Sequence, residues 1–78
     1  MSIHQEIKQS IEGAIAGSEA EVLDGSGGGH FRIKVTSSEF DGKSLLAKQR
    51  MVLSAIKHLM AGDMAPVHAV DKIETLVP

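Results

Sequence analysis

The sequence contains no cysteine, no tryptophan and no tyrosine among its 78 residues. The absence of cysteine excludes a disulfide scaffold, a thiolate metal site and cysteine nucleophilic chemistry. Phe31 and Phe40 are the two aromatic residues, too few for a base-stacking platform. No apolar run approaches the roughly 18 residues of a membrane span, and the N-terminal MSIHQEIKQS does not have the pattern of a signal peptide. We therefore expect a cytoplasmic protein with no membrane partner.

The length predicts one small domain over residues 1–78, with a thin core. Hydrophobic residues make up 42% of the chain and charged residues 23%, as in an ordinary globular domain. A chain this short rarely encloses a substrate pocket, so we do not expect an enzyme.

The net charge of −2 hides an uneven distribution of charge. Residues 32–57 carry six basic and two acidic side chains, whereas the rest of the chain carries two basic and eight acidic ones. A basic segment in an acidic protein could contact phosphate, or it could simply be a solvated helix face.

The apolar pattern of the first half predicts a helix followed by a β-hairpin. Ile3, Ile7, Ile11 and Ile15 recur at every fourth residue, which predicts a helix over residues 2–16 with Ser2 as its N-cap. Residues 19–24 are typical of a short strand, and residues 30–36 alternate cleanly between apolar and charged. The glycine-rich residues 25–29 between them predict a flexible turn.

The second half predicts a helix, whole or broken in two, and a last strand. Ser44 can cap this helix, and Pro66 prevents its continuation. Its apolar positions are Leu45, Leu46, Val52, Leu53, Ile56, Leu59 and Met60. Residues 67–76 form the last strand, whose imperfect alternation admits a bulge. Because a helix separates the last two strands, they should be parallel. The fold class is therefore α+β, a three-stranded mixed sheet covered on one face by helices.

The glycine-rich turn does not match a phosphate-binding loop. His30 stands where the dinucleotide fingerprint needs its third glycine, and no helix follows the turn. Gly42, Lys43 and Ser44 resemble the end of a P-loop, but Ser37 replaces its first glycine. These mismatches disfavour nucleotide hydrolysis.

The four histidines fall into two groups. His4 and His58 are expected to face solvent. His30 opens the second strand and His68 lies one residue into the third, so parallel strands about 4.8 Å apart would bring both to one edge of the sheet. Two imidazoles are incomplete for zinc but suit half of a metal or cluster site completed by a partner. Alternatively, His68 merely hydrogen-bonds at a strand edge.

At these residues the sequence resembles the BolA family. The resemblance rests on His30-Phe31-Arg32-Ile33, on residues 40–45 (FDGKSL), on residues 49–52 (QRMV) and on Val67-His68-Ala69. It covers roughly residues 22–76, and the short glycine-rich hairpin is closer to the acid-stress type of BolA protein. It implies a fold like a type II KH domain, in the order α-β-β-α-α-β.

The resemblance also implies a partner, a monothiol glutaredoxin with a CGFS motif. In such heterodimers the glutaredoxin and glutathione supply thiolates to a [2Fe-2S] cluster, and the BolA protein supplies the histidine of its Val-His-Ala motif, here His68. A second ligand usually comes from the hairpin loop, which here holds only glycine and serine, so His30 is the substitute candidate. We expect the isolated chain to hold no cofactor and to be a monomer or a weak homodimer.

Two other functions remain open from the sequence. Some BolA proteins are described as DNA-binding regulators of stress genes, through a helix-turn-helix-like surface. The corresponding residues here are Lys43, Lys48, Arg50 and Lys57. Alternatively, the chain is an interaction module with an apolar surface, to which Met51, Met60 and Met64 could contribute.

Overall fold

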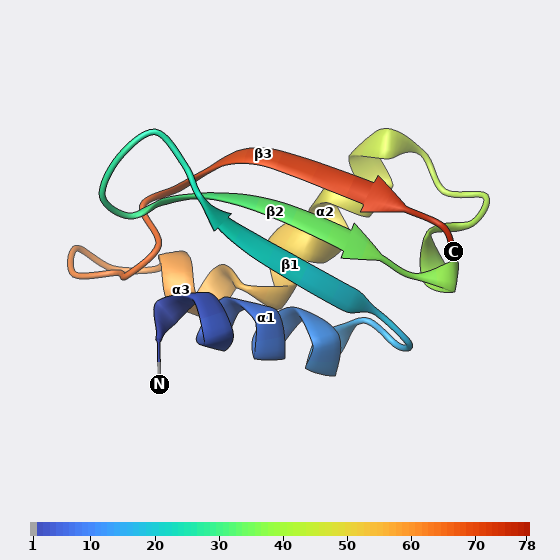
Figure 1. Cartoon of the computed structure of the whole chain (residues 1–78), viewed down its shortest axis with the longest axis horizontal. Helices are drawn as coiled ribbons and strands as arrows, with labels where there is room; N and C mark the ends of the chain where they lie inside the picture. The colour runs from blue at the N-terminus through green and yellow to red at the C-terminus, as the bar shows by residue number, and fades with distance from the viewer. Residues whose placement is uncertain (1) are drawn as a thin grey trace.

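The computed structural model describes residues 2–78, which form one three-stranded sheet with the helices on one side of it (Figure 1). The elements follow in the order α1 (Ile3–Ala14), β1 (Glu19–Asp24), β2 (His30–Thr36), the 3₁₀ turn η1 (Ser38–Phe40), α2 (Leu45–Ala55), α3 (Lys57–Met60) and β3 (Ala69–Leu76). This is the predicted α+β class. Within the described range, no helix has the length and apolar character needed to cross a membrane.

Both long helices begin at the serines predicted to cap them. The Ser2 Oγ accepts a hydrogen bond from the Gln5 N–H at 3.2 Å, and the Ser44 Oγ accepts one from the Ala47 N–H at 3.1 Å. These bonds satisfy backbone donors that the helix itself leaves free. The second helical segment is broken at Ile56 into α2 and α3, one of the two predicted forms.

The strand order is β1-β2-β3, with the predicted hairpin and parallel pair. β1 and β2 are antiparallel, and β2 and β3 are parallel, with His30 opposite Ala69. The predicted irregularity of the last strand is a β-bulge. Phe31 pairs with Val70, and the next residue of β2 pairs with Lys72, so Asp71 is the extra residue.

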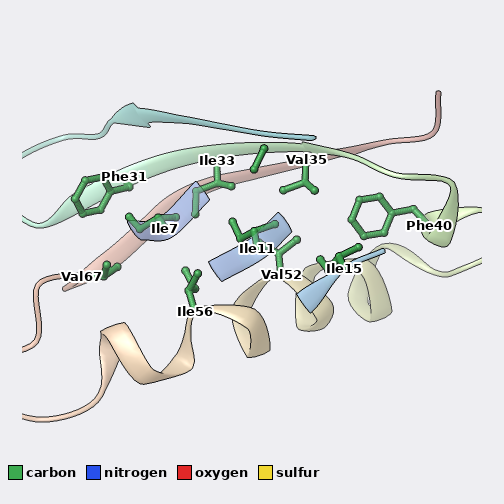
Figure 2. Close-up of a cluster of buried hydrophobic side chains, with 11 residues drawn as sticks. Ile7, Ile11, Ile15, Phe31, Ile33, Val35, Phe40, Val52, Ile56 and Val67 are labelled. Atoms are coloured by element: carbon green, nitrogen blue, oxygen red, sulfur yellow. The ribbon is translucent and has the colours of Figure 1, made fainter. Parts of the chain in front are cut away.

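The core lies between the sheet and the helices, where eleven apolar side chains are buried (Figure 2). α1 contributes isoleucines from successive turns, and β2 contributes every second residue, the apolar face of the strand. The buried residues are Ile7, Ile11, Ile15, Ala20, Phe31, Ile33, Val35, Phe40, Val52, Ile56 and Val67. Ser37 is buried among them without an unmet polar group, because its Oγ donates to the Ala16 carbonyl and accepts from the Glu39 N–H.

Three of the apolar positions predicted for the second helix are exposed. Leu45, Leu46 and Leu53 are 62%, 57% and 37% exposed, whereas Val52 is fully buried. Leu46 and Leu53 lie roughly 100° or more around the helix from Val52, outside its buried stripe. Leu45 occupies the first turn of α2, at the end farthest from the buried Ile56.

The methionines divide between the core and the surface. Met51 and Met60 are partly buried and pack against the core cluster. Met64, in the connection to β3, is 94% exposed.

Candidate metal-ligand site at the start of β2 and β3

His30 and His68 lie at the same edge of the sheet, as predicted from the parallel pairing. His30 is the first residue of β2. β3 begins two residues later than predicted, so the prediction that His68 lies within the strand is wrong, and His68 directly precedes it. The carbonyl oxygen of Gly29 accepts hydrogen bonds from the N–H groups of His68 at 2.8 Å and of Ala69 at 3.2 Å. The backbone of His68 is thereby hydrogen-bonded to Gly29, the residue that precedes His30.

The imidazole of His68 lies directly against Gly29. A Cβ built on Gly29 would stand 2.8 Å from the His68 Cγ and 3.0 Å from its Nδ1, closer than real Cβ atoms approach. Gly29 also has a φ of +75°, which L side chains rarely adopt. Glycine at this position therefore permits both the turn and the close approach of the ring. The His68 residue is otherwise exposed to solvent.

The imidazole of His30 is held by a carboxylate that no sequence motif indicates. The His30 Nδ1 lies 2.9 Å from the Asp71 Oδ1, and the Ser26 N–H donates to the Asp71 Oδ2 at 2.7 Å. These hydrogen bonds, that of His30 first, lower the pKa of Asp71 to about 2. The only sequence signal for this role is the imperfect alternation at the bulge.

The turn between β1 and β2 is not merely flexible, because two of its glycines are in close contact with neighbouring groups. A Cβ on Gly25 would lie 2.6 Å from the Asp71 Oδ2 and 2.9 Å from the His30 carbonyl carbon. Gly29 is in contact with His68, as described above. Gly27 and Gly28 have open space around them. The absence of a side chain at Gly25 thus leaves room for the Asp71 carboxylate, and its absence at Gly29 leaves room for the His68 ring.

The remaining histidines lie outside this site. His4 faces solvent only in part, as its side chain is 40% exposed: its Nε2 lies 2.7 Å from the Asp24 Oδ1, and its ring meets Phe31 edge-on. Asp24 lies at the end of β1, 20 residues from His4, and only the tertiary fold places the two side chains together. His58 is exposed, as predicted, with its Nε2 3.3 Å from the Ser10 Oγ.

The site offers nitrogen donors but not a complete coordination shell. Across residues 2–78, no group of three or more histidine, cysteine, aspartate or glutamate side chains is placed to hold a metal ion. His30 and His68 are neutral donors when deprotonated, and the chain has no thiolate to add. Such a donor set fits a metal or cluster whose other ligands come from elsewhere.

The basic residues considered for nucleic-acid binding do not form one patch. Arg50 and Lys57 line a shallow groove along α2 and α3, together with Leu53 and Met60. Lys48 lies about 200° around the helix from Arg50, and Lys43 lies in the exposed turn before α2. The structure therefore brings together two of the four.

Fold and site together define a small α+β domain whose mixed sheet presents two histidines at one edge.

Comparison with known proteins assigns this domain to a family. A family model described as BolA-like protein matches residues 3–78, and the chain belongs to the BolA-like family. It is 37% identical over 71 residues to BolA-like protein 1 of Mus musculus, over 81% of this chain and 50% of the relative. It is 32% identical over 71 residues to Protein BOLA2 of Arabidopsis thaliana, over 88% of this chain and 72% of the relative.

The fold is also that of solved BolA-family structures. The crystal structure of a bol-like protein from Babesia bovis superposes with a TM-score of 0.76 at 30% sequence identity, covering 100% of this chain and 87% of the other. The chain spans only half the length of the mouse relative named above. The shared part is therefore the BolA-like domain itself.

Proposed function

We propose that this chain is a non-enzymatic adaptor that binds a monothiol glutaredoxin of the CGFS type and co-ligates or helps transfer a [2Fe-2S] cluster, in iron-sulfur homeostasis and the stress response. The proposal rests on membership of the BolA-like family. The observation that carries it is the exposed imidazole of His68, seated against Gly29 beside the start of β2.

In this proposal the chain supplies nitrogen and the partner supplies sulfur. His68 is the first ligand and His30 the second, and thiolates of the glutaredoxin and glutathione complete the coordination of the iron atoms. Exchanging thiolate for imidazole raises the potential of a cluster and weakens its hold on one side, which suits transfer. An imidazolium cannot ligate, so acid that protonates the two histidines should reduce loading.

The test is anaerobic reconstitution of the cluster on this protein mixed with a CGFS glutaredoxin and glutathione, followed by visible circular dichroism. We expect a spectrum that differs from that of the glutaredoxin alone and that changes in His68→Ala. His58→Ala is the matched control, because His58 is an exposed histidine outside the site. If His68→Ala and His58→Ala leave the same spectrum, His68 is not a ligand.

The second candidate function is that of a DNA-binding regulator, favoured by the placement of Arg50 and Lys57 in one groove. Each phosphate that a cation neutralises releases counterions, so binding should weaken with salt. Changing both residues to glutamate should then weaken binding to any DNA sequence and flatten its salt dependence. Unchanged binding would exclude this surface.

A further inference from the structure

The carboxylate of Asp71 joins β3 to the glycine-rich turn and the start of β2, which lie 45 and 41 residues earlier in the chain. Asp71 is the bulged residue of β3 and has no partner in the register with β2. One carboxylate oxygen faces the Nδ1 of His30, and the other accepts the N–H of Ser26 in the turn. The missing side chain of Gly25 leaves the space in which the carboxylate lies. The bulge thus directs an acidic side chain at His30.

The contact determines which nitrogen of His30 carries the proton. An ionised carboxylate accepts hydrogen bonds and donates none, so the nitrogen that faces it must be the donor. Neutral His30 therefore carries its proton on Nδ1 and has its lone pair on Nε2. Histidines that bind metals are held in the same way, with the second ring nitrogen donating to a carboxylate.

We propose that Asp71 is a positioning residue, which holds His30 in the Nδ1–H form and presents its Nε2 as the second nitrogen donor to the shared cluster. This inference rests on the function proposed above and goes beyond it, because it assigns a role to a residue outside the family-like motifs.

The same molecule contains a reference pair with the opposite arrangement. His4 meets Asp24 through its Nε2, at 2.7 Å. By the same reasoning, neutral His4 carries its proton on Nε2. Two histidines with an aspartate partner should therefore show opposite tautomers in one spectrum.

The first part of the test needs only the free protein. Long-range ¹H–¹⁵N NMR spectra, recorded at a pH high enough for both rings to be neutral, report the tautomer of each ring. We expect the Nδ1–H form for His30 and the Nε2–H form for His4. Asp71→Ala should abolish the preference of His30 and leave His4 unchanged, whereas Asp24→Ala, the matched control, should do the reverse. A His30 tautomer that does not respond to Asp71→Ala would overturn the positioning role.

The second part measures nitrogen coupling in the reduced cluster of the glutaredoxin complex by pulsed EPR. We expect two histidine nitrogens in the wild type and one in His30→Ala. Asp71→Ala should weaken or remove the same coupling that His30→Ala removes. One nitrogen in the wild type, lost in His68→Ala, would leave the adaptor function standing and overturn the role of His30. No histidine nitrogen at all would overturn the proposed ligands themselves.

Discussion

Replacement of Gly29 by alanine tests the seat of the His68 ring. Gly29 and Gly42 share a φ of +75°, so alanine at either position bears the same backbone penalty. This left-handed conformation costs an L residue about 1–2 kcal/mol. A Cβ at Gly42 would have no atom within 4 Å, whereas a Cβ at Gly29 would collide with the His68 Cγ. Gly42→Ala is therefore the matched control.

The extra cost of Gly29→Ala comes from moving the imidazole. Forcing a side chain off its rotamer costs about 0.5–1.5 kcal/mol, so Gly29→Ala should lose about 1.5–3.5 kcal/mol of unfolding free energy in all. With a urea slope of about 1 kcal/mol/M for so small a domain, Gly42→Ala should lower the midpoint by about 1–2 M. Gly29→Ala should lower it by roughly a further 0.5–1.5 M.

Urea unfolding followed by far-ultraviolet circular dichroism gives both midpoints, and NMR gives the ring shifts of His68. We expect those shifts to change in Gly29→Ala and to stay the same in Gly42→Ala. Equal midpoints for the two variants, together with unchanged His68 shifts, would refute the close packing of ring and glycine.

Three further predictions concern pH, the core and a helix cap. The pKa of Asp71 is about 2 in the folded chain against an ordinary 3.8. Its ionised form therefore stabilises the fold above pH about 4, and this contribution is lost as the pH falls through about 2. The NMR shift of the Ser26 amide should titrate near 2, and a midpoint near 4 would contradict the contact. Ile11→Val should cost about 0.5–1.5 kcal/mol in urea unfolding, because Ile11 is fully buried; a neutral result would mean that the core is loosely packed there. Ser44→Ala should cost about 1 kcal/mol and speed hydrogen exchange at the Ala47 amide, which loses its acceptor; unchanged exchange would argue against the cap.

Local patterns are sufficient to predict most of the fold. The alternation of residues 30–36 and the two capping serines act within a few residues of chain, and the structure places them as expected. The parallel pairing also follows from local information, since a helical connection between neighbouring strands leaves little choice. The imperfect alternation of the last strand correctly indicates a bulge.

The contacts that complete the site could not be predicted in the same way. Asp71 is 41 residues from His30, and nothing near either residue indicates that they meet. The close packing of Gly25 and Gly29 depends on side chains from β3 and its approach, so the turn alone suggests only flexibility. The contact of His4 could not be predicted for the same reason, because its partner Asp24 belongs to another element.

The strand order has a consequence for when the site exists. β1 and β2 are joined by a short turn, and such a hairpin closes in microseconds, whereas the pairing of β2 with β3 must first close a long connection that contains two helices. His30 therefore takes its place with the hairpin, but His68 and Asp71 join it only when the last strand docks. Before the last strand docks, the hairpin end therefore lacks both the second imidazole and the carboxylate that holds the first. The pair of histidines and the Asp71 carboxylate thus come together only once the last strand has docked.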